Sequence, residues 1–218
     1  AALGFHPAEK AVRILTNSLF YKKRAEYHQT VTEMLRKMNA CTTLQGLTDL
    51  IVDTIYREIK VNNLAFYLKS SDQRRYDIVN HRHWGRIESI SADDPLVLEM
   101  QKNNQVVSKD SLLPPFTFFQ NSLTRLNQHA LFYKLNSKNA EALVPFFEKD
   151  DLLGFILIGT KASDDPFFED DLKILEMIGN QAILGLKNTR LYEISQNKVK
   201  ELTTLFEVAK MMSSTLDI

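Results

Sequence analysis

The sequence predicts an α+β fold in which an antiparallel sheet carries helices packed on one face and has long helices at both ends. Strand patterns occur as hairpins at residues 64–84 and 141–160, and helical patterns precede and follow them. Strands clustered as hairpins, with helices at the two ends, favour an α+β sheet over a doubly wound one. The 218 residues, 44% hydrophobic and 25% charged, allow one globular domain with helical extensions.

The first third of the chain predicts two helices followed by a hairpin. Residues Ala8–Ala40 place apolar side chains at helical spacing without a proline, and a second helix follows Thr42 or Thr43, either of which can cap it. Residues Leu64–Lys69 are apolar on both faces, which is typical of a central strand. A polar turn then leads into a second strand at Tyr76–Trp84.

Two histidines of this second strand raise the question of a metal site. His81 and His83 are two residues apart, so in a regular strand they share one face, a geometry that a metal ion accepts. No third ligand is recognisable nearby, and an exposed edge strand explains the pair more simply. We therefore expect no metal site.

The rest of the sheet is predicted from three short patterns. Asp93-Asp94-Pro95 opens a short helix that runs through Met100, and Gln105–Ser108 resembles a short strand. Residues Glu141–Phe147 and Leu152–Thr160 are apolar runs separated by a charged turn, which is a strong signal for an antiparallel hairpin. The sheet therefore resumes late in the chain, after an irregular region.

The irregular region, Lys109–Ala140, is where we expect a ligand to bind. Apolar and hydrogen-bonding side chains alternate there, as in a small-molecule pocket, and loops over a rigid sheet often carry binding residues. The alternative is a loop and one amphipathic helix whose polar residues face water. The candidate ligand contacts are Phe116, Thr117, Asn121, Thr124, Arg125 and Asn127.

The last 53 residues predict one long helix beginning near Pro166. No proline follows Pro166, and Ser163, Asp164 and Asp165 can cap the helix start. The first half has the broad apolar stripe of a helix packed on a domain. A narrower stripe follows at 3-4-3 spacing, which is typical of a helix that pairs with another helix: Leu202, Leu205, Ala209 and Met212.

This helix defines the expected organisation of the chain. We predict a linker or dimerisation helix at residues 1–41, a sensory domain at 42–192, and a signalling helix at 193–218 that is either a relay or the start of a second module. Such a helix packs in the domain core at one end and pairs with another helix at the other end. It can therefore carry a structural change in the domain to a neighbouring module. The alternative is a linker that only joins two copies.

Composition excludes several classes of partner. Lysine and arginine number 27, as do aspartate and glutamate, so nothing suggests the positive field that nucleic acid or an anionic membrane requires. The apolar run Leu152–Ile158 is far shorter than the roughly 20 residues that span a bilayer. Cys41 is the only cysteine, which excludes an internal disulfide and agrees with a reducing cytoplasm.

The late hairpin and the helix after it resemble a GAF domain, a small-ligand sensory module of signalling proteins. The resemblance rests on Ala142–Phe146, Gly154–Ile158, Phe168–Leu175 and Asn180–Asn188, and it covers about Thr43–Tyr192. It implies that an occupied pocket regulates an output domain. Family members that attach a bilin use a cysteine inside the domain, whereas Cys41 precedes it.

The resemblance also implies a ligand class and a structural pair. Members that bind cyclic nucleotides carry a discontinuous asparagine-lysine, phenylalanine, aspartate-glutamate motif. The matching positions are Thr160-Lys161, Phe167 and Asp171-Leu172, so the lysine, phenylalanine and aspartate are kept while asparagine and glutamate are replaced. We expect Lys161 and Asp171 to pair and fix the helix start. We expect the ligand to be a cyclic nucleotide such as cAMP or cGMP, held in part by Arg125.

Two functional hypotheses follow. The first is a regulatory sensor that binds a small ligand, forms a homodimer through its terminal helices and signals to an output domain, such as a kinase, a diguanylate cyclase or a phosphatase. The second is a ligand-free module for dimerisation. No glycine-rich phosphate loop, nucleophile motif or metal-ligand cluster is recognisable, so we expect this chain itself to be no enzyme.

Overall fold

The computed structural model describes residues 32–85, 88–102, 104–112 and 131–216. Residues 32–39 are helical and Ala40 lies in a turn, while residues 8–31 of the predicted helix Ala8–Ala40 lie outside the described residues. Helix α2 follows at Leu44–Thr54 and continues as a π-helical turn at Ile55–Ile59. The hydroxyl of Thr43 caps α2 by accepting the backbone N–H of Gly46 at 3.2 Å.

The sheet has six strands in the order β3-β2-β1-β6-β5-β4, and all neighbours are antiparallel. Strand β1 is central, as predicted from its two apolar faces. The α+β antiparallel fold is therefore confirmed. The strand bounds are Leu64–Lys69 for β1, Arg75–Arg82 for β2, Ile90–Ser91 for β3, Val107–Ser108 for β4, Ala142–Glu148 for β5 and Asp151–Ile158 for β6.

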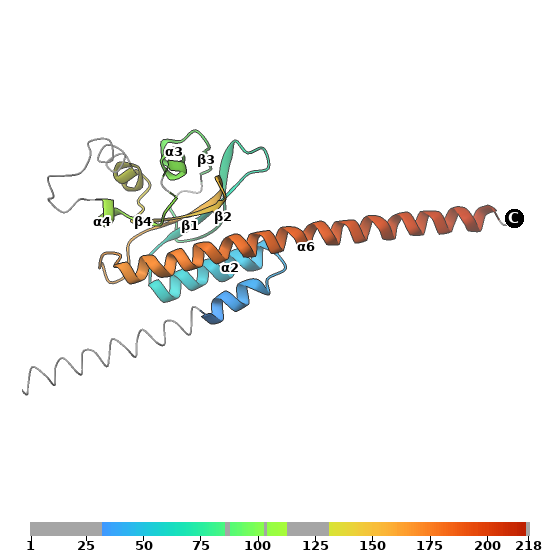
Figure 1. The fold of residues 1–218 in the computed structure, drawn as a ribbon, viewed down its shortest axis with the longest axis horizontal. Helices are drawn as coiled ribbons and strands as arrows, with labels where there is room; N and C mark the ends of the chain where they lie inside the picture. The colour runs from blue at the N-terminus through green and yellow to red at the C-terminus, as the bar shows by residue number, and fades with distance from the viewer. Residues whose placement is uncertain (1–31, 86–87, 103, 113–130, 217–218) are drawn as a thin grey trace, which may run out of the picture. The chain divides into compact units, whose positions relative to one another are not determined.

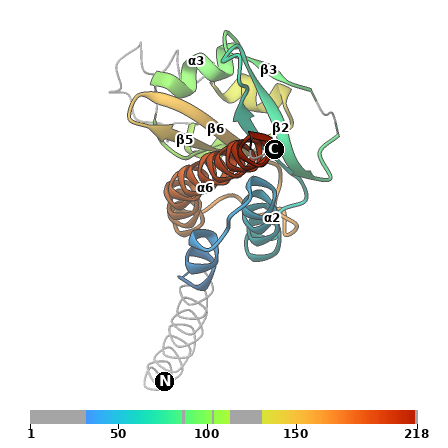
Figure 2. The ribbon, with the colours of Figure 1, turned by 90° about the vertical axis from the view of Figure 1, so that its right-hand side faces the viewer.

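One face of the sheet is covered by α2 and by the long helix α6, which spans Glu169–Leu216 (Figures 1 and 2). The side chains of Leu175, Ile178 and Ala182 are buried there. Gly185 of α6 allows a close approach, because a Cβ atom at this position would lie 2.7 Å from Leu47 Cδ1 of α2. The two long helices therefore pack on one face, as the sequence predicts.

The opposite face carries shorter helical elements: α3 at Pro95–Lys102, α4 at Lys109–Leu112 and the helical residues 131–137. Figure 2 shows α3 on the side of the sheet away from α2 and α6. We call the buried apolar core on this side the outer cluster. It consists of Ala65, Tyr67, Tyr76, Ile90, Leu96, Val97, Met100, Leu112, Leu131, Leu135, Ala140, Leu143, Leu152, Phe155 and Leu157.

Two element boundaries differ from the prediction. Helix α6 begins at Glu169 rather than near Pro166, because the carbonyl of Pro166 accepts a hydrogen bond from Lys161 Nζ at 3.1 Å instead of joining the helix. Strand β2 ends at Arg82, and His83 has a left-handed backbone with φ of 49°. His81 and His83 therefore do not share a strand face, and the predicted metal-compatible geometry is wrong.

Candidate functional site

The six predicted ligand contacts lie outside the described residues. They are Phe116, Thr117, Asn121, Thr124, Arg125 and Asn127. The elements on either side of this segment are described, and both belong to the outer cluster: Leu112 ends α4, and Leu131 and Leu135 lie in the helical residues 131–137. The segment that contains the predicted ligand contacts is therefore flanked on both sides by residues of the outer cluster.

The structure brings Lys161 and Asp171 together at the start of α6. The ammonium of Lys161 forms an ion pair with the Oδ2 atom of Asp171, and the two side chains are only 10% and 18% exposed. The same Oδ2 atom accepts the backbone N–H of Phe168 at 2.9 Å, just before the helix begins. Asp171 therefore holds both the lysine and the backbone N–H of the residue that directly precedes α6.

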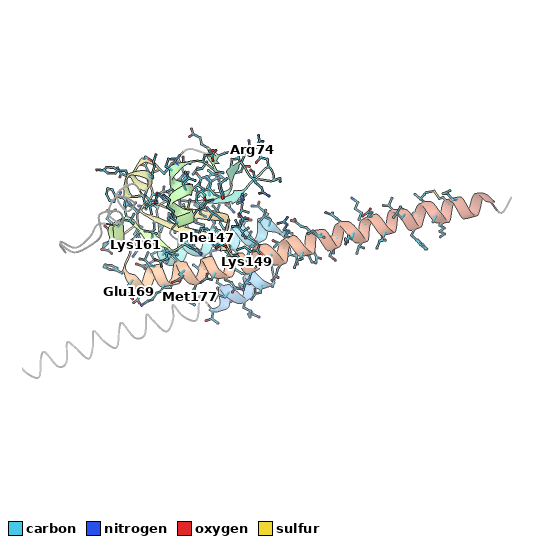
Figure 3. The ribbon with its side chains drawn as sticks, turned by 45° about the horizontal axis from the view of Figure 1, so that its top comes forward. Arg74, Phe147, Lys149, Lys161, Glu169 and Met177 are labelled. Carbon is cyan, nitrogen blue, oxygen red and sulfur yellow. The ribbon has the colours of Figure 1, made fainter. Side chains whose placement is uncertain are left out.

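Lys161 is fixed by several further contacts. Its Nζ atom lies 5.3 Å from the ring centroid of Phe167 and 5.2 Å from that of Phe168. Its backbone pairs with Val61, next to the start of β1. Figure 3 labels Lys161 close to Glu169, at the first turn of α6. With its charge paired and its side chain enclosed, Lys161 ties the end of β6 to α6 and has little capacity left for a ligand.

Two tyrosines contribute aromatic surface to the outer cluster. The Tyr67 ring stacks on Phe155 with 4.8 Å between centroids, and Tyr76 lies 5.3 Å from the same ring. Burial raises the pKa of both phenols to about 12. The Tyr76 hydroxyl donates to the carbonyl of Leu152 at 3.0 Å. Both phenols are therefore neutral at physiological pH, and the cluster has an aromatic, uncharged interior.

One acidic residue, Glu99, is buried beside the apolar outer cluster. Glu99 lies on α3 and is only 8% exposed. One carboxylate oxygen, Oε1, accepts from Lys102 Nζ at 2.7 Å, whereas the buried Oε2 has no hydrogen-bond partner. Glu99 was not among the residues predicted from the sequence, although its spacing of three from Leu96 places it on the apolar face of the predicted short helix.

The described residues offer no alternative centre of metal chemistry. No group of three or more histidine, cysteine, aspartate or glutamate residues among them could hold a metal ion. The ring of His83 packs beside Tyr56 at 5.8 Å between centroids.

Within the described ranges, no helix combines the length and the apolar character needed to span a membrane.

The second half of α6 exposes a regular apolar surface. Every side chain from Arg190 to Met212 is exposed, and α6 continues beyond the sheet in Figure 1. Apolar side chains recur at intervals of seven residues on this helix, interrupted once by Lys198. We call this series the α6 seam: Met177, Leu184, Leu191, Leu205 and Met212, which are between 38% and 65% exposed. Figure 3 shows Met177 on the first part of α6.

Sequence comparison gives one distant curated relative. No protein-family model matches the sequence. Diguanylate cyclase A of Treponema denticola is 24% identical over 210 residues, which cover 88% of this chain and 54% of that protein. The chain thus spans about half the length of the curated relative that it matches.

Solved structures identify the fold. The GAF domain of an Acinetobacter phosphoenolpyruvate-protein phosphotransferase is 14% identical with a TM-score of 0.53, covering 75% of this chain and 93% of that chain. The GAF domain of the Coxiella burnetii phosphotransferase is 11% identical with a TM-score of 0.55, covering 77% and 96%. This chain folds as a GAF domain. The resemblance predicted from the hairpin Ala142–Ile158 and the helix after it is confirmed.

The GAF domain is also similar in structure to a module that holds a chromophore. The chromophore-binding domain of a bacteriophytochrome from R. palustris is 12% identical with a TM-score of 0.57, covering 78% of this chain and 63% of that chain. At such identities the likeness concerns the fold alone.

Proposed function

We propose that this GAF domain is a regulatory sensor. It binds a small ligand, with a cyclic nucleotide such as cAMP or cGMP as the first candidate, and it relays occupancy along α6 to an output domain. The observation that carries the proposal is the continuity of α6, a single helix of 48 residues that is domain core in its first half and exposed in its second.

The continuity of α6 supports a relay because one unbroken helix joins the packed first half to the exposed second half. In the first half, Leu175, Ile178 and Ala182 are buried in the domain, and Lys187 Nζ pairs with Glu148 Oε1 of β5 at 2.7 Å. A shift of the sheet therefore displaces the helix as a body. A ligand drives such a shift only by binding one arrangement better than the other.

The α6 seam supports a second copy of this chain as the partner. Its interval of seven residues matches the heptad of a coiled coil, and Leu202 and Ala209 occupy the alternate positions that complete the pattern near the end of the helix. A homodimer buries the same surface of both copies, which suits an apolar stripe that repeats along one helix. The proposed dimer therefore extends from the predicted residues 202–212 back toward Met177.

The comparisons support a signalling role and an output of the cyclase type. The matched relative is named a diguanylate cyclase, and about half of its length lies outside the match. The structural neighbours include a chromophore-binding domain, so this fold encloses ligands in other proteins. In the proposal the GAF domain regulates, and catalysis belongs to a separate domain.

The test is the thermal unfolding of this chain with a panel of cyclic mononucleotides and dinucleotides. A ligand that binds only the folded state at 100 times its dissociation constant adds roughly 2.7 kcal/mol to the free energy of unfolding. The midpoint should rise by several degrees with one nucleotide, and Arg125→Ala should reduce the rise. If no member of the panel raises the midpoint, the cyclic-nucleotide part of the proposal is wrong.

A ligand-free dimerisation module is the second candidate, and the packing of the outer cluster favours it. Tyr67, Tyr76 and Phe155 are each at most 2% exposed, so the aromatic surface on this side already serves as core. This candidate predicts a dimer whose dissociation constant no small molecule changes. Sedimentation velocity with and without a ligand from the panel separates the two candidates.

A further inference from the structure

Glu99 carries an unsatisfied hydrogen-bonding capacity inside the domain. Among the described residues, two buried side-chain polar atoms have no hydrogen-bond partner, Glu99 Oε2 and His81 Nδ1. A buried carboxylate oxygen without a partner is costly, because its loss of hydration is not compensated. If the domain binds a ligand as proposed, the Oε2 atom of Glu99 is a place where a hydrogen-bond donor of that ligand fits.

The Glu99 side chain, which carries the unpartnered oxygen, lies on the face of α3 that packs on the outer cluster. Leu96, Glu99 and Met100 lie three and four residues apart, so they share one face of α3. Leu96 and Met100 are fully or almost fully buried in the outer cluster. The carboxylate therefore sits among the apolar groups between α3 and the sheet, as one of the few placed polar groups that orient a ligand in an apolar site.

The second unpartnered atom lies on the same side of the sheet. His81 on β2 is directly opposite Ala65 on β1, and side chains of directly opposed residues share a face. Ala65 belongs to the outer cluster, so the His81 ring faces the side that α3 covers. Both unpartnered atoms of the described residues thus lie on one side of the sheet, away from α2 and α6.

Lys102 pairs with only one of the two carboxylate oxygens of Glu99, and the other oxygen is buried. Its ammonium approaches Oε1 from the solvent side, since the Lys102 side chain is 57% exposed and that of Glu99 is 11% exposed. The free oxygen is an acceptor only, because an ionised carboxylate has no hydrogen to donate. The complementary ligand group is therefore an N–H or O–H donor, and two adjacent donors fit best if Lys102 swings out to solvent.

We propose that Glu99 selects the base of the cyclic nucleotide and favours guanine over adenine. This inference rests on the proposed function. The pairing edge of guanine presents a ring N–H and an amino group side by side, both donors to a carboxylate. The corresponding edge of adenine presents one amino donor beside an unprotonated ring nitrogen, which repels the carboxylate oxygen. Guanine therefore gains a hydrogen bond and adenine meets two facing acceptors.

The test measures dissociation constants of cGMP and cAMP by isothermal titration calorimetry for the unmodified chain, Glu99→Gln and Glu176→Gln. Glu176 is an exposed residue of α6 and serves as the matched control. The unmodified chain and Glu176→Gln should bind cGMP about 10-fold more tightly than cAMP, the factor expected for one hydrogen bond to a charged group. In Glu99→Gln, whose amide offers both a donor and an acceptor, the preference should disappear.

The outcomes separate this inference from the proposed function. Equal binding of both nucleotides, or a guanine preference that survives Glu99→Gln, overturns the role of Glu99 and leaves a cyclic-nucleotide sensor. Binding of neither nucleotide to the unmodified chain overturns both proposals. If Glu99→Gln does not fold, as judged by its unfolding transition without nucleotide, Glu99→Asp replaces it, because the shorter side chain withdraws the carboxylate while keeping its charge.

Discussion

Asp171 performs two tasks with one carboxylate, and its loss should be costly. It pairs with the enclosed ammonium of Lys161 and accepts the N–H of Phe168. In Asp171→Ala the Lys161 charge stays in place without its partner, and the start of α6 loses its cap. We expect the free energy of unfolding to fall by about 2–4 kcal/mol, as measured by urea denaturation.

Asp165→Ala is the control for this experiment. Asp165 is exposed in the same loop, so its removal should change the free energy of unfolding by less than about 0.5 kcal/mol. Equal losses in the two variants would show that the loop, and not the ion pair, stabilises the start of α6.

The buried tyrosines make stability depend on alkaline pH. Burial raises the pKa of Tyr67 and Tyr76 from 10.0 to about 12. Between these values the unfolded chain has released protons that the folded chain keeps, so stability falls as pH rises. Below pH 10 both states hold these protons, and the tyrosines contribute no dependence. The expected slope is about 1.4 kcal/mol per pH unit for each tyrosine.

The measurement is urea denaturation at several values of pH between 9 and 11.5. Tyr76→Phe removes one of the two groups, so the part of the slope caused by these tyrosines should fall by about half. The same variant loses the hydrogen bond to the Leu152 carbonyl, which should cost about 1 kcal/mol at neutral pH. A slope that Tyr76→Phe leaves unchanged would assign the dependence to other groups.

Among the elements, the pair of central strands depends on a glycine. Strand β1 passes so close to Gly154 of β6 that a Cβ atom there would lie 2.3 Å from the Tyr67 carbonyl oxygen. This oxygen is backbone in the middle of the sheet and cannot move aside. Gly154→Ala should therefore lower the free energy of unfolding by about 1–3 kcal/mol.

Gly85→Ala is the matched control, because no atom of the described residues, apart from its chain neighbours, lies within 4 Å of the Cβ position at Gly85. The same substitution should there be almost neutral, or slightly stabilising through the lower entropy of the unfolded chain. Thermal unfolding of both variants by circular dichroism provides the comparison. A similar loss in both would contradict the packing argument.

Sequence periodicity predicted the elements well and their ends less well. The run Leu64–Lys69 and the charged turn before Asp151 were sufficient to place β1, β5 and β6, because alternation and turn chemistry are local. The end of β2 depends on the left-handed His83, and the start of α6 depends on Lys161 reaching the Pro166 carbonyl. Both features are close in sequence, but neither a left-handed φ nor a lysine bonded to a carbonyl five residues later follows from the spacing of apolar residues.

The α6 seam should hold two copies of this chain together. Leu202 and Leu205 are 65% and 59% exposed, so a second helix has apolar surface to bury. The double variant Leu202→Lys, Leu205→Lys introduces charge at Leu205 of the seam and at the alternate position Leu202, and it should raise the dimer dissociation constant by about 100-fold or more. Sedimentation velocity over a range of concentrations measures this constant.

Glu207→Lys is the control, since it introduces the same side chain on the side of α6 that lies away from Leu202 and Leu205. It should leave the dimer almost unchanged. A monomeric unmodified chain at high concentration, or equal weakening by both substitutions, would contradict a dimer through the α6 seam.

At the scale of the whole molecule, the proposed ligand site is the part that the sequence defined least. The pair Lys161 and Asp171 was recognisable from a family motif, because the two residues lie only ten positions apart, one after β6 and the other in the first turn of α6. Glu99 was not singled out, since a single acid in an amphipathic helix usually faces water, and only burial in the folded domain reveals its unpartnered oxygen. Sites that form from distant elements need the fold.

The proposed relay along α6 leads to a prediction for the whole molecule. If ligand binding changes the dimer, dimerisation must change ligand affinity by the same factor, because coupling between two equilibria is reciprocal. The affinity for cGMP should therefore differ about 5-fold or more between the dimeric chain and the variant Leu202→Lys, Leu205→Lys, although both substitutions lie in the exposed half of α6. Calorimetry at concentrations where the unmodified chain is dimeric measures the difference, and Glu207→Lys should behave as the unmodified chain. Equal affinities in a monomer and a dimer that both bind cGMP would show that α6 joins two sensors without carrying a signal between them.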